Sequence, residues 1–364
     1  MEAKKKAETR YVGIDLGKRT YEMAIIEKGS VKKSNGKTSV EGRQYLYKKL
    51  RPNDKVALEA CSLAFVIAKE LEATVRCRVY VLNPYHLPLI YGSMKKTDKE
   101  DSLKLAHILE DFQEDRLPEV PVPSDKEMNR RKLLAGYRRA QQSRNREINK
   151  LHALFLAQGI TTVKRKDLSE TGVRKEAIKV LTGLEREEAE YLVACLCLHE
   201  QRAEALSLQI KKESEGDEVI ERLQGVPGVG PMVAFAFVSH VAPERFENAS
   251  QVSNYLGLVP RVYMSGDTVR YGQITKRGNG YLRALLVQAS WALTRAKQGG
   301  KLKERYEYMT IEKSKGKKQA IVAIARRLSE LLYVLMRDET NYESRSFIRE
   351  KKAVEELARL AISA

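Results

Sequence analysis

Short apolar segments near the start of this 364-residue chain constrain its fold more than any other feature. They predict five strands and two helices in the following order: strands at 11–17, 21–27 and near 29–32, a helix at 39–50, a strand at 55–58, a helix at 62–71 and a strand at 78–82. A hairpin followed by alternating strands and helices gives an α/β sheet with an antiparallel edge. The sequence therefore predicts an α/β domain at the N-terminus.

A stiff linker ends this domain, since Pro118, Pro121 and Pro123 follow one another closely. We place the first domain at 1–123. Apolar residues then recur at spacings of three and four through two long segments, 124–158 and 185–215. This pattern predicts a helical middle region at 124–216, either a helical hairpin or a dimerising coiled coil.

The remaining residues, 217–364, are predicted to form a mainly helical domain. Its first feature is the glycine-rich segment 225–230, which lies between two apolar segments. Helix, glycine hairpin and helix resembles the helix-hairpin-helix DNA-binding motif, in which glycines such as Gly228 and Gly230 let backbone N–H groups approach a phosphate. An ordinary tight turn between two helices explains the same residues equally well.

A large positive charge restricts the partners of the chain. The formal net charge is +18 and the pI is about 9.6. This excess favours DNA or RNA, because cations that neutralise phosphates release counterions. The sequence has no run of 18 apolar residues and no apolar segment behind its basic N-terminus, so we expect no membrane span and no signal peptide. A cytoplasmic protein is expected.

Four acidic residues of the first domain follow strands or begin a helix. Asp15 follows the first strand, Glu59 closes the fourth, and Asp98 and Asp101 lie three residues apart at a helix start. Acids are common at helix N-termini, which by itself explains the last two. In an RNase H-like sheet, however, the first strand lies beside a later one, so the carboxylates would meet. Four carboxylates can hold two Mg²⁺ ions about 4 Å apart, as in phosphodiester cleavage.

A serine among cations marks the third region. Ser265 precedes Gly266, and the basic residues around it are Arg261, Arg270, Lys276, Arg277 and Arg283. A hydroxyl on a glycine-containing turn inside a ring of cations suits attack on a phosphodiester, whose growing negative charge the cations would stabilise. The alternative is a basic loop that only contacts a nucleic-acid backbone.

These motifs together resemble a known family. The N-terminal ones are Tyr11–Lys18, Glu59 and Lys96–Asp101, and the C-terminal ones are Gly225–Gly230, Tyr255–Arg261, Ser265-Gly266 and Ile274–Asn279. They resemble the transposases of the insertion sequence 110 family. The first domain of that family is of the DEDD type and is similar to the RuvC Holliday-junction resolvase. The motifs occur in the family's order and span most of the chain.

The resemblance implies a specific chemistry and specific partners. It implies an RNase H-like (RuvC-like) first domain, a serine nucleophile at Ser265 and Mg²⁺ bound by Asp15, Glu59, Asp98 and Asp101. It also implies guidance by a structured non-coding bridge RNA that pairs with target and donor DNA. Such proteins act in the prokaryotic cytoplasm, at the nucleoid, as dimers that form tetramers in the synaptic complex. Two domains from different subunits then make one active site.

One residue departs from the family pattern. Asp267 stands where members usually have a second glycine after Ser-Gly. Its carboxylate would oppose a backbone phosphate or join the metal ligands.

Three other functions compete with recombination. The four acids alone fit a metal-only, RuvC-like junction resolvase that uses water. The segment 14–17 also resembles the first phosphate loop of actin-like ATPases, but no second Asp-Gly phosphate loop follows. The charge alone fits a non-catalytic nucleic-acid-binding protein, which leaves the acids unexplained.

We expect Arg261, Lys276, Arg277 and Arg283 to bind nucleic-acid phosphates, together with the backbone at Gly228 and Gly230.

Overall fold

The computed structural model describes residues 9–87, 98–265 and 268–344. The chain forms two compact units, Met1–Ser124 and Asp125–Ala364, and the boundary between them in the sequence follows the proline linker. The second unit contains both the helical middle region and the C-terminal region. The predicted division between those two regions, at 216/217, stays a prediction.

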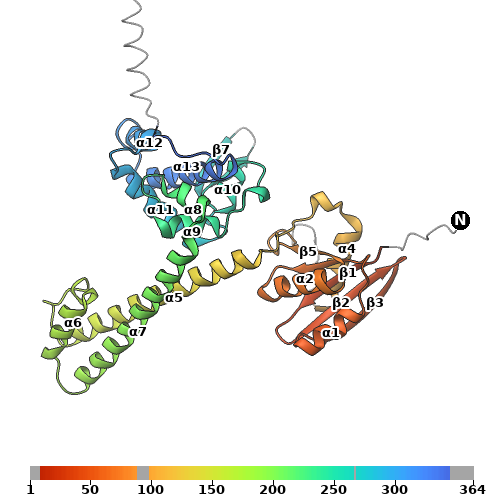
Figure 1. Cartoon of the computed structure of the whole chain (residues 1–364), viewed down its shortest axis with the longest axis horizontal. Helices are drawn as coiled ribbons and strands as arrows, with labels where there is room; N and C mark the ends of the chain where they lie inside the picture. Colours follow the sequence, from red (N-terminus) through yellow and green to blue (C-terminus); the bar gives the residue numbers. More distant parts are fainter. Residues whose placement is uncertain (1–8, 88–97, 266–267, 345–364) are drawn as a thin grey trace, which may run out of the picture. The chain divides into compact units, whose positions relative to one another are not determined.

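The first unit is built on a mixed five-stranded sheet (Figure 1). Its strands are β1 (Tyr11–Leu16), β2 (Thr20–Glu27), β3 (Ser30–Lys37), β4 (Lys55–Glu59) and β5 (Arg78–Leu82). They lie in the order β3-β2-β1-β4-β5, with β1, β2 and β3 antiparallel and β1, β4 and β5 parallel. The α/β sheet with an antiparallel edge is therefore confirmed, and β1 lies at its centre.

Helices cover both faces of this sheet. Alternate residues of β1 point to opposite faces, so Val12 and Ile14 pack in a core with α1 (Val40–Lys48) and α2 (Ser62–Thr74). The other face carries Gly13 and is covered by α4 (Asp98–Asp111). A Cβ at Gly13 would lie 2.0 Å from the Ser102 carbonyl oxygen. Glycine is therefore required for α4 to lie directly on β1.

A long helical hairpin begins the second unit, which is one of the two arrangements that the sequence predicts. Helix α5 (Asp125–Ala157) packs against α7 (Gly183–Ser214). The predicted spacing of three and four in 185–215 corresponds to a seam of α7 that is buried at Leu192, Leu196, Ala203, Leu206 and Ile210. His199, the polar residue within this seam, is half-buried. The structure confirms that the two helices pack together within one chain.

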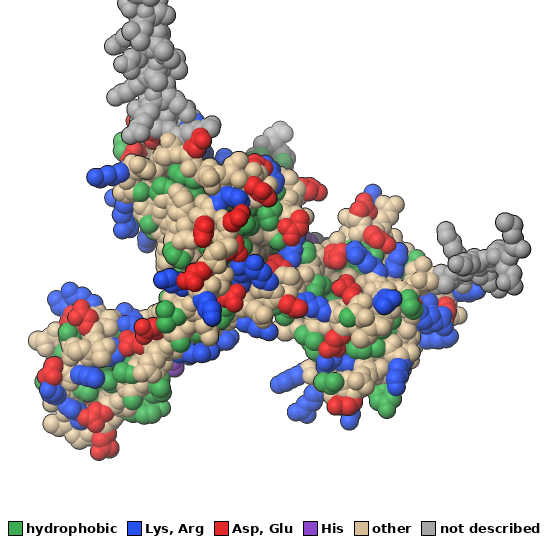
Figure 2. Space-filling view, viewed as in Figure 1, with side chains coloured by type: hydrophobic (Ala, Val, Ile, Leu, Met, Phe, Trp, Pro, Cys, Tyr) green, Lys and Arg blue, Asp and Glu red, His purple; other side chains and the backbone are tan. Residues whose placement is uncertain are grey.

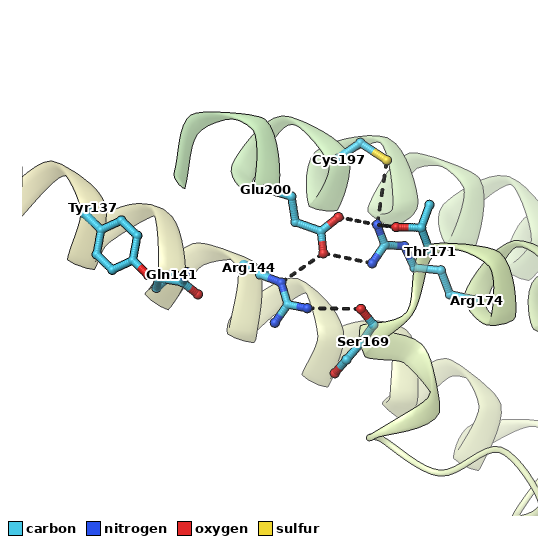
Figure 3. A network of polar contacts seen from close by, with 8 residues as sticks. All are labelled: Tyr137, Gln141, Arg144, Ser169, Thr171, Arg174, Cys197 and Glu200. Atoms are coloured by element: carbon cyan, nitrogen blue, oxygen red, sulfur yellow. Dashed lines mark hydrogen bonds and ion pairs between the residues drawn. The ribbon is translucent and has the colours of Figure 1, made fainter. Parts of the chain in front are cut away.

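A polar network fixes the segment between these helices, which contains α6 (Thr171–Ala177) (Figure 3). The guanidinium of Arg174 is fully buried and binds the carboxylate of Glu200 on α7. Arg144 of α5 donates to the same carboxylate at 2.9 Å and to the Ser169 carbonyl at 3.1 Å. Burial alone would raise the pKa of Glu200, but the hydrogen bonds from Arg174 and Arg144 outweigh it and lower the pKa.

Helices dominate the rest of the second unit. They are α8 (Glu218–Gln224), α9 (Pro231–Val238), α10 (Ala249–Tyr255), α11 (Gly280–Arg295), α12 (Gly300–Ile311) and α13 (Lys317–Arg337). Residues 233–237 of α9 are all buried, so this helix forms the centre of the core. Leu134 of α5 and Ile210 of α7 belong to the same core, so the base of the helical hairpin packs into it.

The segment around Ser265, interpreted as a loop, is a two-stranded antiparallel sheet of β6 (Pro260–Ser265) and β7 (Thr268–Ile274). The mainly helical C-terminal region therefore carries a β-hairpin.

Candidate active site and nucleic-acid interface

Asp15 and Glu59 lie at the carboxyl ends of neighbouring parallel strands. The register pairs Ile14 of β1 with Leu58 of β4, and the two acids are the next residues along each strand. Asp15 shares a face with Gly13, and Glu59 shares a face with Ala57, which packs in the core beneath α4. Both acids therefore belong to the face that α4 covers. Asp15 is half-buried and Glu59 is exposed.

The other two predicted acids belong to α4, which begins at Asp98 as predicted. The side chain of Asp98 lies outside the described residues. Asp101 directly precedes Ser102, the residue whose carbonyl faces Gly13 on β1. The Nζ atom of Lys104 lies 2.9 Å from Oδ1 of Asp101. Helix α4 thus places Asp101 one residue before its close contact with β1.

Carboxylates are the ligands that Mg²⁺ prefers, and the face beneath α4 presents them at adjacent strand ends. Among the described side chains, which exclude that of Asp98, no three His, Cys, Asp or Glu residues lie close enough together to hold a metal ion. The donor types and their shared face fit Mg²⁺. The four-acid site itself stays a prediction.

Ser265 ends the strand β6. It forms the last residue pair of the hairpin, with Thr268, whereas Gly266, Asp267 and the side chain of Ser265 lie outside the described residues. The hairpin is exposed on both faces: Tyr263 is 59% exposed and Met264 and Tyr271 are each 72% exposed. An isolated two-stranded hairpin is marginally stable in water, so such a surface is suited to binding a partner.

Cations surround this hairpin. Arg261, Arg270, Lys276 and Arg277 are exposed, and none of them forms an ion pair within the described part of the chain. These four side chains are available for phosphates.

Arg283, the fifth predicted cation, has a structural role. Its Nη1 donates to the Leu256 carbonyl at 3.0 Å and also to the Arg277 carbonyl, and burial lowers its pKa. Arg283 thereby braces the loop that carries Arg277.

The base of the hairpin is held in a strained conformation. Lys276 has a φ of 56°, in the left-handed region that non-glycine residues rarely adopt. Its amide donates to the Gly257 carbonyl at 3.1 Å, and a Cβ at Gly257 would lie 2.3 Å from the Arg277 carbonyl oxygen. The close contact between these two segments fixes Lys276 and Arg277 beside the hairpin. Strain of this kind is concentrated at functional sites.

The two glycines of the predicted helix-hairpin-helix differ in their surroundings. Gly228 has a φ of 85°, and a Cβ there would lie 2.4 Å from the Ala289 carbonyl oxygen of α11. Gly228 is therefore needed for packing. Gly230 precedes α9, and a Cβ there would meet no atom within 4 Å. Of the two, Gly230 has the open surroundings that a phosphate contact requires.

Comparison with known proteins agrees with both parts of this arrangement. Residues 12–160 match the family model for the DEDD transposase domain of IS110 elements. Residues 220–307 match the model described as "Transposase IS116/IS110/IS902 family". The chain belongs to the IS110 family of transposases. It is an enzyme of the class that cleaves and recombines DNA, and its first matched domain is of a typically metal-dependent kind.

Relatives of this IS110-family transposase carry the same designation. A "Probable family 20 transposase" of Pseudomonas aeruginosa is 26% identical over 341 residues, which are 91% of this chain and 98% of the relative. The "Transposase for insertion sequence element IS1111A" of Coxiella burnetii is 30% identical over 135 residues, 37% of each chain. The "Transposase for insertion sequence element IS1328" of Yersinia enterocolitica is 26% identical over 292 residues, covering 77% of this chain and 82% of the relative.

No helix in the described part of the chain combines the length and the apolar character that a membrane span requires.

Proposed function

We propose that this transposase cuts and rejoins DNA with Ser265 as its nucleophile. The observation that carries the proposal is the position of Ser265 at the end of an exposed hairpin. This hairpin carries Arg261 and Arg270 on its strands and has Lys276 and Arg277 at its base, and these four cations are exposed and form no ion pair in the described part of the chain. Arg261, Lys276 and Arg277 would hold phosphates farther along the DNA strand, toward the base of the hairpin.

The proposed reaction is an exchange of phosphodiester bonds. The Ser265 hydroxyl loses its proton to solvent and its oxygen attacks a DNA phosphorus atom, forming an O–P bond. The P–O bond to one deoxyribose breaks, and that oxygen takes up a proton as a free hydroxyl. A hydroxyl from another DNA end then attacks the phosphoserine linkage, releasing Ser265 and joining the strands. No external energy source is needed, because each P–O bond that breaks is replaced by another.

The first unit would supply the acidic half of the site. Asp15, Glu59, Asp98 and Asp101 would hold Mg²⁺, in two positions. Bound there, the ions would polarise the phosphate and stabilise the leaving oxygen. The central position of β1 and the parallel β4 beside it support the predicted RNase H-like fold.

The partners in this proposal are nucleic acids. A formal charge of +18 supports binding of target and donor DNA, together with a bridge RNA that pairs with both. Activity in the cytoplasm, at the nucleoid, belongs to the same proposal.

The proposed active assembly is a homo-oligomer, a dimer that forms a tetramer in the synaptic complex. Helix α7 buries one seam against α5 but exposes a second, in which Leu184, Tyr191 and Leu198 recur every seven residues. Such a heptad stripe is typical of coiled-coil contacts. Four glutamates occupy positions 185–190, whereas Lys211 and Lys212 end the helix. An antiparallel pair of α7 helices from two copies would bring these opposite charges together.

A comparison of Ser265→Ala with Asp15→Ala tests the mechanism. Recombination between an element end and its target should be lost in both variants. Wild-type protein should be trapped covalently on DNA, and Ser265→Ala should form no adduct. Recombination by Ser265→Ala with a dead Asp15→Ala would instead support the metal-only nuclease, which cuts with water and leaves no covalent product.

A further inference from the structure

The strand register places two lysines on the face of the sheet that carries Asp15. Asp15 pairs with Glu22, and Glu22 pairs with Asn35 on β3. Thr20, two residues before Glu22, pairs with Lys37, whereas Ala24, two residues after it, pairs with Lys33. Since side chains two residues apart share a face, Lys33, Asn35 and Lys37 lie on the face of Asp15.

This face is open at β3. Helix α4 packs on β1, β2 and β4, and the side chains of Lys33, Asn35 and Lys37 are exposed. Lys33 and Lys37 are four residues apart on one strand, about 13 Å. One strand of a DNA duplex advances about 3.4 Å for each phosphate, so this distance spans several phosphates.

The turn between β1 and β2 adds two cations at the carboxyl end of β1. Lys18 and Arg19 are both exposed. The buried Thr38, which follows Lys37, holds this turn: its hydroxyl donates to the Lys18 carbonyl at 3.2 Å and its amide to the Arg19 carbonyl at 3.0 Å. These bonds keep the turn beside the end of β3.

Electrostatics explain why cations are needed here. Glu22 lies directly across from Asp15, and Glu59 lies on the other side, so three carboxylates occupy neighbouring strands on one face. Unless cations offset their charge, these carboxylates repel a phosphodiester that approaches. The four cations of the turn and β3 form no ion pair within the described part of the chain, so their charge is free to offset that repulsion.

We propose that Lys18, Arg19, Lys33, Asn35 and Lys37 form a phosphate strip that holds the backbone of the DNA strand to be cut beside Asp15. Figure 2 shows Lys and Arg side chains at the β3 edge of the first unit. The strip extends the proposed function, because it supplies the first unit with DNA contacts of its own. The expected ligand of the strip is DNA, since the strip flanks the acid that is assigned to cleavage.

Lysines on an edge strand also prevent sheets from pairing edge to edge. Lys32 distinguishes the two roles. It lies on the same strand but points to the opposite face, since it pairs with Ile25 of the α1–α2 core. Edge protection would involve Lys32 as much as its neighbours, whereas a phosphate strip would not.

Lysine acetylation followed by mass spectrometry tests the strip on the full chain. The Asp15→Ala variant is used so that the DNA stays intact. A duplex that carries an element end should slow acetylation of Lys18, Lys33 and Lys37 several-fold and leave Lys32 unchanged. Equal rates with and without duplex would overturn the proposal, as would protection by the bridge RNA alone.

A binding measurement supplies the second readout. The slope of log duplex affinity against log salt concentration reports the number of phosphates contacted. The Lys33→Gln/Lys37→Gln variant should lower this slope by the equivalent of about two phosphate contacts, whereas Lys32→Gln should not. An unchanged slope in the double variant would contradict the strip. This binding is measured without cleavage, so loss of the Ser265 mechanism and loss of the strip give different results.

Discussion

The side-chain amide of Asn279 lies 2.8 Å from Nε2 of His240 and joins the start of α11 to the end of α9. The Oδ1 atom of Asn279 accepts from the Tyr281 and Leu282 amides, so its Nδ2 donates to the histidine. Nδ1 of His240 lies 2.9 Å from the Ala236 carbonyl and must carry the ring proton. His240 is therefore neutral, and it holds Asn279, the last residue of the motif Ile274–Asn279.

This contact predicts a loss of stability in mild acid. Burial lowers the pKa of His240, so the unfolded chain binds a proton that the folded chain rejects. The contribution of the neutral His240 to the free energy of unfolding is complete above about pH 6.5. It declines below that pH, by at most about 1.4 kcal/mol per pH unit. Urea unfolding at pH 7.5 and 5.5 measures it. A His240→Gln variant should lack this component, and an identical pH dependence in both proteins would contradict it.

Removing Glu200 should strongly destabilise the helical hairpin. Glu200→Ala leaves the fully buried Arg174 without its carboxylate, which costs about 3–5 kcal/mol. Denaturant unfolding measures the change. The exposed Glu204 on the same helix is the matched control, and Glu204→Ala should stay within about 0.5 kcal/mol of wild type. Replacing Arg174 and Glu200 together by Met and Leu should recover most of the loss; a double variant as unstable as Glu200→Ala would show that the ion pair is not the cause.

A methyl group at Gly13 should separate α4 from β1. Gly13→Ala places a Cβ 2.0 Å from the Ser102 carbonyl oxygen and 2.5 Å from the Ala106 nitrogen, both backbone atoms. We expect the free energy of unfolding to fall by about 1–3 kcal/mol, because the added methyl group overpacks this contact. Recombination should also weaken, because α4 carries Asp98 and Asp101. Thermal unfolding and recombination assays measure both effects. Gly172→Ala in α6, where a Cβ meets nothing within 4 Å, should instead stabilise the protein by up to about 1 kcal/mol.

The strained backbone of Lys276 predicts opposite effects on stability and binding. Lys276→Gly relieves a left-handed conformation that costs about 1–2 kcal/mol. Glycine also loses more conformational entropy on folding, which offsets about 0.5–1 kcal/mol of this gain. It should therefore be as stable as wild type or slightly more so, whereas Lys276→Ala should show no gain. Both variants should lose one phosphate contact in the salt dependence of DNA affinity. Full affinity in either one would remove Lys276 from the interface.

The exposed seam of α7 predicts a specific effect on assembly. Leu198→Glu places a charge in the heptad stripe at the middle of α7, where two antiparallel helices would cross, and should reduce self-association by at least tenfold. Sedimentation at several concentrations measures it. Val180→Glu introduces the same charge at an exposed apolar residue outside α7 and should leave assembly unchanged. Equal assembly of the two variants would exclude this seam.

Elements with strong local patterns were predictable. The five strands, the two long helices and the buried positions of α7 follow from periodicity, because the side chains that face a core recur with the period of the element. The β6–β7 hairpin was interpreted as a loop since it lacks that signal: both of its faces are exposed, so no face had to be apolar. The pairing of Val262 and Met264 with Tyr271 and Val269 is visible only in the register.

The sequence by itself determined the family, the types of residue at the candidate site and their order along the chain. Only the tertiary structure decided which of them share a surface. Asp15 and Glu59 lie at the ends of neighbouring strands because β4 pairs in parallel beside β1, although 43 residues lie between them. Arg283 braces a loop and Gly228 packs against α11, roles that depend on contacts between segments far apart in the chain. Local pattern specifies an element, whereas long-range packing specifies its neighbours.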